Sequence, residues 1–312
     1  MLHNYYSVDT IKSLLDKTDT LMVLPYDSAC ALAETGVIAS GLSSLGHSFN
    51  EVWSISNTEI DRGTSGRCQW SKSKEVLCAA IWKTPDQCKN LEKATQSAYE
   101  ELLALLYQFD YRHPFRFWNY LPNINAGNND EEQYKKFCMG RFNAFKTKGI
   151  PPNQFPAASA LGHHTEGAVI YVIADRSPSI HHKNALQSNA YEYPRQYGIS
   201  SPSFSRATSI TVGAKPLFFI SGTASIIGHK TQHANDLKKQ VQTTIENIQH
   251  LLKHANNHAL PLQSMKVYLR HANDYSLAKK LLQKTFLTVP ILFTHADICR
   301  TDLLVEIECF CS

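Results

Sequence analysis

The chain has 312 residues, 43% of them hydrophobic and 19% charged, and a formal net charge of +4. These values are typical of a folded globular protein and exclude a largely disordered chain. Lysines and arginines are dispersed along the sequence rather than clustered, so we expect no nucleic-acid-binding surface. The small positive excess suits a small anionic substrate.

The sequence predicts a cytoplasmic protein that does not enter a membrane. No apolar run approaches the ~18 residues needed to span a bilayer. The first residues lack the basic and apolar segments of a secretory signal. The eight cysteines are scattered without paired spacing, so we expect reduced, mostly buried thiols rather than a zinc site.

The first half of the chain contains a helix–strand–helix pattern. Residues 90–107 place apolar side chains on one helical face, residues 115–120 are typical of a strand, and residues 131–145 predict a second helix. Short extended segments are expected before this pattern, near residues 51–54 and 76–82.

The second half repeats this order of elements. A helix is predicted after the capping residues Asn235 and Asp236, followed by a strand at 265–270 and a helix at 274–283. We expect this strand to lie beside the last strand of the chain. Three extended segments are expected before the pattern: 168–174, 209–212 and 217–222.

Alternating helices and strands predict an α+β fold, and the duplication predicts two fused units, each a mixed sheet with helices packed on one face. The stretch 146–156, which contains Gly, Pro and Asn, is expected to separate a unit of residues 1–150 from one of residues 151–312. Because an internal copy can replace a subunit contact, we expect a monomer.

The fourteen histidines raise the question of a metal site. His163–His164 and His181–His182 are adjacent pairs, and adjacent side chains point in different directions on a strand or a helix. The spacing of four residues or the carboxylate partners typical of metal sites are missing, so we expect no metal and no cofactor.

The last strand carries the most distinctive polar residues. Residues 303–308 alternate in character, which places Glu306 and Glu308 on one face of a strand, with Cys299 and Arg300 in the preceding turn. This grouping favours a chemical site. An edge strand whose carboxylates face water is the structural alternative.

A second cluster follows residue 190. Pro194 and Pro202 restrict the backbone of their loop, so its tyrosines are held in a preformed arrangement. The rings of Tyr191, Tyr193 and Tyr197 could wall a ligand site with their hydroxyls free to bind oxygen atoms. The alternative is that they pack the loop onto a sheet.

Several segments together resemble the chorismatase family, whose members release pyruvate from chorismate. The resemblance covers most of the chain from about Arg116 onward, whereas the first hundred residues are similar only loosely. It implies a fold of two fused YjgF-like (chorismate-mutase-like) units. The matching segments, all in the same order, are 117–125, 140–145, 156–162, 190–206, 221–229 and 297–308.

The resemblance also implies roles for individual residues. Chorismate carries two carboxylates, which arginine binds well, and an enol ether that needs a proton donor. Glu306, seven residues after Cys299, matches the family's proton donor. Cys299 matches a position where members that form 3-hydroxybenzoate have Cys and hydrolysing members have Ala. The matching substrate contacts are Tyr134, Arg141, Tyr193, Arg206 and Gly222.

Residue spacing agrees with part of this assignment. Tyr134 and Arg141 lie seven apart in a predicted helix and therefore share a face, although a solvated face is the alternative. Gly222, at the end of a predicted strand, would let the backbone approach a ligand, and a phosphate-binding loop is the weaker explanation. Arg270 could bind a carboxylate or remain on the surface.

We therefore expect an enzyme that cleaves chorismate to pyruvate and 3-hydroxybenzoate, with or without 4-hydroxybenzoate. One alternative is a hydrolase that gives pyruvate and a dihydroxycyclohexadiene carboxylate. Another is a YjgF-like metabolite-binding protein without turnover. A YjgF-like deaminase is disfavoured, because the arginine of such proteins is missing from residues 290–296.

Overall fold

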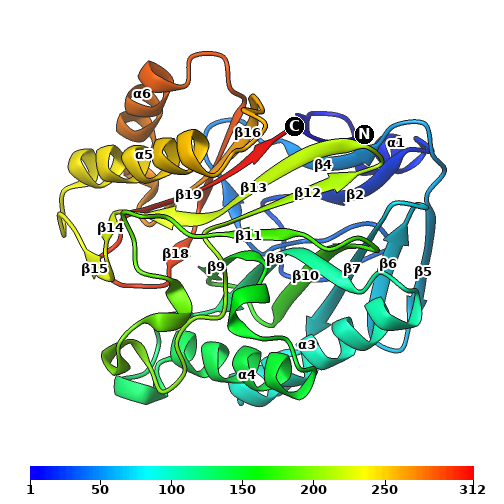
Figure 1. Cartoon of the computed structure of the whole chain (residues 1–312), viewed down its shortest axis with the longest axis horizontal. Coiled ribbons are helices and arrows are strands. Elements are labelled where there is room, and N and C mark those ends of the chain that lie inside the picture. The colour runs from blue at the N-terminus through cyan, green and yellow to red at the C-terminus, as the bar shows by residue number, and fades with distance from the viewer.

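Two seven-stranded sheets make up most of the structure, a computed structural model that describes residues 1–312 (Figure 1). A three-stranded sheet and a two-stranded ribbon, β14 (Ile226–Ile227) and β15 (Lys230–Thr231), complete the strands. Short 3-10 turns occur at Asn129–Glu131, Pro152–Gln154, Ala190–Glu192, Arg195–Tyr197 and Ala272–Asp274.

The first large sheet has the strand order β18-β9-β8-β10-β7-β6-β5. Helices α3 (Leu91–Gln108) and α4 (Gln133–Thr147) cover one of its faces, and the short α2 (Pro85–Cys88) precedes them. The strands are β5 (Asp61–Ser65), β6 (Cys68–Lys72), β7 (Val76–Lys83), β8 (His113–Pro122), β9 (Ala157–His163), β10 (Ala168–Asp175) and β18 (Asp297–Ile298).

The second large sheet has the order β11-β12-β13-β19-β16-β17-β3. Helices α5 (Leu237–His254) and α6 (Tyr275–Thr285) cover one of its faces. The strands are β11 (Ile180–His182), β12 (Ala207–Val212), β13 (Lys215–Ala224), β16 (Leu262–Leu269), β17 (Ile291–His295), β19 (Val305–Cys311) and β3 (Ser43–Ser44).

The two sheets are built by the same path of the chain. Strands β5, β6 and β7 correspond in order to β11, β12 and β13, and α3 corresponds to α5. Each sheet then has one parallel pair joined by a crossover helix: β8 and β9 through α4, and β16 and β17 through α6. The prediction of two fused α+β units with helices on one face of each sheet is confirmed.

Each sheet is completed at one edge by a short strand from outside its unit. Strand β18 pairs with β9, although it lies near the end of the chain. Strand β3, from the first fifty residues, pairs with β17. Each large sheet therefore depends on a strand from another part of the chain.

One predicted strand belongs to the other sheet. Residues 168–174 were expected at the start of the second unit, and this placement is wrong because β10 pairs with β7 and β8 in the middle of the first sheet. The sheets divide between Asp175 and Ile180. The expected boundary at 150/151 instead separates α4 from β9, which belong to the same unit.

The first sixty residues form a separate small sheet of order β1-β4-β2. Its strands are β1 (Leu2–Ser7), β2 (Thr20–Leu24) and β4 (Asn50–Ile55), and α1 (Ile11–Leu15) follows β1. The extended segment expected at 51–54 is therefore present, in this third sheet. Thr10 caps α1 by accepting a hydrogen bond from the Ser13 N–H.

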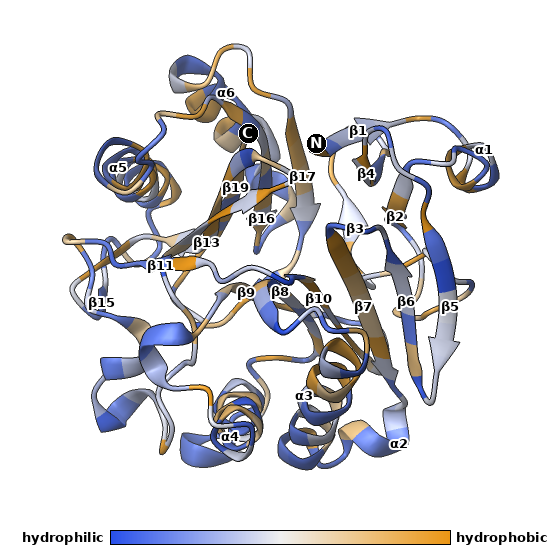
Figure 2. Ribbon diagram, turned by 45° about the vertical axis from the view of Figure 1, so that its right-hand side comes forward, coloured by the Kyte–Doolittle hydropathy of each residue, from blue (hydrophilic) through white to orange (hydrophobic).

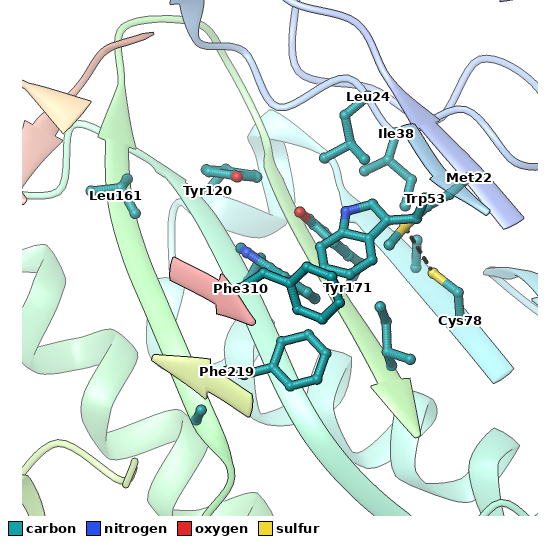
Figure 3. Close-up of a cluster of buried hydrophobic side chains, with 14 of the residues drawn as sticks. Met22, Leu24, Ile38, Trp53, Cys78, Tyr120, Leu161, Tyr171, Phe219 and Phe310 are labelled. Atoms are coloured by element: carbon teal, nitrogen blue, oxygen red, sulfur yellow. Dashed lines mark hydrogen bonds between the residues drawn. The ribbon is translucent and has the colours of Figure 1, made fainter. Parts of the chain in front are cut away.

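The inner faces of all three sheets meet in one apolar cluster (Figure 3). The centre of the Trp53 ring, from β4, lies 5.2 Å from the centre of the Phe310 ring and 6.0 Å from that of Phe219. The outer faces of the large sheets are buried under their helices, while edge strand β5 is mostly polar (Figure 2). None of the helices combines the length and apolarity of a membrane span.

Candidate active site

A cavity of about 480 Å³ lies between helix α4 and strand β9 of the first unit and strands β13 and β19 of the second. This volume is in the range of small-molecule sites. Its lining includes all seven side chains or backbone positions predicted from the sequence: Tyr134, Arg141, Tyr193, Arg206, Gly222, Cys299 and Glu306.

Glu306 is a buried carboxyl group without a hydrogen-bond partner. It is 5% exposed, on strand β19, and lines the cavity. Burial and the neighbouring charge of Glu308 raise its pKa to about 8, against the opposing charges of Arg116 and Arg206. At neutral pH the group is therefore mainly protonated, as a general acid must be.

Glu308, two residues further on the same face, has the opposite environment. Burial alone would raise its pKa, but Lys266, Arg116 and hydrogen bonds lower that pKa to about 2. The partners of its two oxygens are Arg116 Nη2 at 2.7 Å, Ser159 Oγ at 2.6 Å, Trp118 Nε1 at 2.8 Å, Tyr268 OH at 2.9 Å and Lys266 Nζ at 3.2 Å.

Ser159 connects this ionic group to the cavity wall. Its Oγ donates to Glu308 and accepts from the Gly222 N–H at 3.0 Å. Gly222 lies in a bulge of β13 opposite β19, between Ile220 and Thr223. A Cβ at this position would collide with Oε1 of Glu306 and lie 3.1 Å from Ser159 Oγ. Glycine at 222 therefore leaves the space that the Glu306 carboxyl occupies.

Two buried arginines in the cavity wall have no carboxylate partner. Arg141 is 1% exposed, and its Nε and Nη2 make no hydrogen bond. Arg206 is 4% exposed; its Nη2 donates to Tyr193 OH and the Ser188 carbonyl, while its Nε is unpaired. Because a buried charge without a partner is costly, both guanidinium groups are suited to bind anionic groups of a ligand.

Cys299 and Tyr134 are neutral side chains in the same cavity. Burial and the nearby Glu306 raise the pKa of the Cys299 thiol to about 12, so it remains protonated. Burial also raises the pKa of Tyr134 well above its usual value. Both can therefore act as weak acids or hydrogen-bond donors toward a ligand, but not as anions.

Of the three tyrosines in the loop after residue 190, two line the cavity and one packs against the core. Tyr193 and Tyr197 line the cavity with ring centres 5.2 Å apart. Tyr191 packs against Phe155 beside the core under α4, so for this residue the packing explanation is correct.

Arg300 was noted in the sequence only by its position, and it lines the cavity as well. Its guanidinium lies 4.1 Å from the centre of the Tyr197 ring and donates to the His229 carbonyl. Arg270 does not reach the cavity. It pairs with Asp297 at 2.6 Å and donates to the carbonyls of Ile298 and Arg300, which fixes the turn that carries Cys299.

The histidine pairs lie apart from the cavity lining. His163 ends β9, and burial lowers its pKa to about 4, whereas His181 and His182 belong to β11. No three His, Cys, Asp or Glu side chains are grouped as metal ligands would be.

Residues 51–174 match the family model of the chorismatase FkbO/Hyg5-like N-terminal domain. The chain is 35% identical to a 3-hydroxybenzoate synthase of Streptomyces hygroscopicus over 83% of this chain and 80% of that protein. It is 34% identical to a chorismatase of Streptomyces rapamycinicus, with 84% and 81% covered. A chorismatase crystal structure superposes with a TM-score of 0.88 at 26% identity and covers 100% of this chain and 98% of that one.

Proposed function

We propose that this chain, which belongs to the chorismatase family, is an enzyme that cleaves chorismate to pyruvate and 3-hydroxybenzoate. The proposal rests on the different protonation of two neighbouring carboxyl groups. One lies in the cavity wall, and the other lies behind that wall. Glu306 is protonated and unpaired, and Glu308 is ionised and fully paired. Carboxyl groups with such separated pKa values are typical of acid–base sites.

The two carboxylates of chorismate would be bound by Arg141 and Arg206. Both guanidinium groups are buried, lack carboxylate partners and line the cavity from different units. A charge-assisted contact to each would hold the substrate across the cavity. Tyr134 and Tyr193 would then contact the ring and its oxygen atoms.

Glu306 would donate its proton to the terminal methylene carbon of the enolpyruvyl group. The ether carbon then becomes an oxocarbenium ion, and the bond between the ring carbon and the ether oxygen breaks. Its electron pair stays on the oxygen, which becomes the keto oxygen of pyruvate. The ring then loses one proton and becomes aromatic. Uptake of one proton by the Glu306 carboxylate balances this loss and regenerates the acid, so no water is consumed.

The fate of the ring decides the product. Direct loss of the proton from the hydroxyl-bearing ring carbon gives 4-hydroxybenzoate, whereas 3-hydroxybenzoate requires the hydroxyl oxygen to move to the neighbouring carbon. Entry of one water molecule gives the dihydroxycyclohexadiene carboxylate instead. We propose that the protonated thiol of Cys299 and the Glu306 carboxyl, which fills the space beside Gly222, favour the route without water.

Incubation of purified protein with chorismate tests the function directly. The expected result is release of pyruvate together with 3-hydroxybenzoate, resolved by chromatography from 4-hydroxybenzoate and the diene diol. Glu306→Gln serves as the inactive control. Pyruvate with mainly diene diol would identify a hydrolase, and binding of chorismate without pyruvate would identify a metabolite-binding protein.

We also propose that the enzyme is a monomer that works in the cytoplasm. Support for the monomer comes from the cavity, which is lined by both units of one chain. Light scattering at micromolar concentration tests this: a mass of about 35.1 kDa is expected.

A further inference from the structure

A buried ionic network behind the cavity joins all three sheets. Its four charged side chains are Glu51 from β4, Arg116 from β8, Lys266 from β16 and Glu308 from β19, each at most 6% exposed. Lys266 Nζ lies 2.6 Å from Glu51 Oε2 and 3.2 Å from Glu308 Oε1. Lys266 is thus shared by two carboxylates and lies closer to the one from the N-terminal sheet.

Glu51 has three hydrogen-bond donors besides Lys266. Its oxygens accept hydrogen bonds from Tyr26 OH at 2.8 Å, Trp53 Nε1 at 3.0 Å and Asn4 Nδ2 at 3.1 Å. Glu51 and these three donors all belong to the first sixty residues, none of which lines the cavity. The N-terminal sheet therefore contributes a fixed negative charge to the network and nothing to the substrate cavity.

The charges of the network balance. Arg116 and Lys266 supply two positive charges, and Glu51 and Glu308 supply two negative charges. The remaining groups that face the network or Glu306 are tyrosine hydroxyls, the Ser159 hydroxyl, the Asn4 amide, two indoles, the Cys299 thiol and the Arg206 guanidinium. The tyrosines are Tyr6, Tyr26, Tyr120, Tyr171 and Tyr268 on the side of the network and Tyr134 on the side of Glu306. The network itself is therefore neutral, and Arg206 is the one further charged group that acts on Glu306 and favours its ionised form.

We propose that Glu51 is a positioning residue for the catalytic acid: by engaging Lys266 it leaves Glu308 strongly negative beside Glu306, and so keeps Glu306 protonated in the free enzyme. This inference rests on the proposed role of Glu306. Without the charge of Glu51, the network would carry one excess positive charge. Glu306 would then lose its proton more easily, because a positive surrounding stabilises the carboxylate.

The test is the pH dependence of kcat/KM for chorismate cleavage in Glu51→Gln, which keeps the shape of the side chain and removes its charge. The alkaline limb of the profile is expected to move to lower pH by roughly one unit, as for removal of one buried charge near a titrating group. Glu51→Asp retains the charge and should keep the wild-type limb. Tyr26→Phe removes a hydrogen bond without a change of charge and is the matched control.

Two further measurements keep the inference testable. If Glu51→Gln does not fold, the double variant Glu51→Gln/Lys266→Met restores the charge balance and should show the wild-type limb; a displaced limb would contradict the inference. If the wild type does not cleave chorismate, infrared titration of the Glu306 carboxyl band, assigned by its loss in Glu306→Gln, replaces the rate. An unchanged titration in Glu51→Gln would overturn the role of Glu51 independently of the function.

Discussion

Glu306 and Glu308 lie on the same face of one strand, two residues apart, and their carboxyl groups have opposite protonation at neutral pH. Burial and the charge of Glu308 raise the pKa of Glu306 to about 8. Five polar partners hold Glu308 ionised, with a pKa of about 2. Burial and the charge of its ionised neighbour together keep Glu306 protonated.

Glu306→Gln should abolish pyruvate release while the protein stays folded. Loss of a general acid lowers a rate by on the order of a hundredfold or more, and Glu306 has no hydrogen bond whose loss would unfold the chain. Stopped assays of pyruvate and circular dichroism measure the two effects. A variant with near-wild-type turnover would exclude Glu306 as the proton donor.

Glu308→Gln is expected to act mainly on stability. It leaves Arg116 and Lys266 buried without their common carboxylate, and removal of one partner of a buried ion pair costs about 3–5 kcal/mol. Urea unfolding should therefore show a large loss for Glu308→Gln and a small change for Glu306→Gln. Equal losses would mean that the ionic network contributes little to folding.

The pH dependence of stability tests the pKa of Glu306 without any substrate. The folded pKa is raised above the unfolded value, so the folded state binds more protons between about pH 4.5 and pH 8. The stability contributed by the protonated group is complete below this window and is lost as the pH rises through 8. The melting temperature of Glu306→Gln should therefore rise relative to the wild type from pH 5 to pH 9.

Arg141→Ala and Arg206→Ala should each weaken substrate binding. A charge-assisted contact contributes about 1.5–3 kcal/mol, so KM is expected to increase at least tenfold. Arg195→Ala is the matched control, because Arg195 is exposed and pairs with Asp130 at 2.7 Å on the outside of the same loop. If both cavity variants kept the wild-type KM, the substrate carboxylates would bind elsewhere.

Cys299→Ala should divert the product toward the diene diol. The smaller side chain opens room for water beside Glu306 and removes the thiol as a hydrogen-bond donor. Chromatography of the reaction mixture gives the product ratio, and Cys88→Ala, outside the cavity, is the control. An unchanged ratio would identify Cys299 as a packing residue.

The terminal strand shows how much of the site could be predicted. Alternation over 303–308 is a local pattern, so it correctly predicts that Glu306 and Glu308 share a face. The expected pairing of this strand with 265–270, which came from the repeat of elements, is also confirmed. It cannot predict the different environments of the two carboxyls. The partners of Glu308 come from positions 116, 118, 159, 266 and 268, which only the folded sheets bring together.

The fold prediction assigned residues 168–174 to the wrong unit because the partners of a strand cannot be read from its own sequence. The apolar periodicity of 168–174 identifies a buried strand, but pairing between strands depends on contacts far apart in the sequence. Strand β10 follows β9 closely in the chain and yet inserts between β7 and β8. The prediction of the seven site residues likewise depended on the family resemblance, since residue spacing left alternatives open for each of them.

The position of β19 also constrains how the chain folds during synthesis. This strand occupies the centre of its sheet, between β13 and β16, but follows both of them in the sequence. Until it emerges from the ribosome, both neighbours present unpaired edges, which are prone to aggregation. The acid that we assign to catalysis lies on this late strand, so a nascent chain that lacks it can be neither complete in its second sheet nor active.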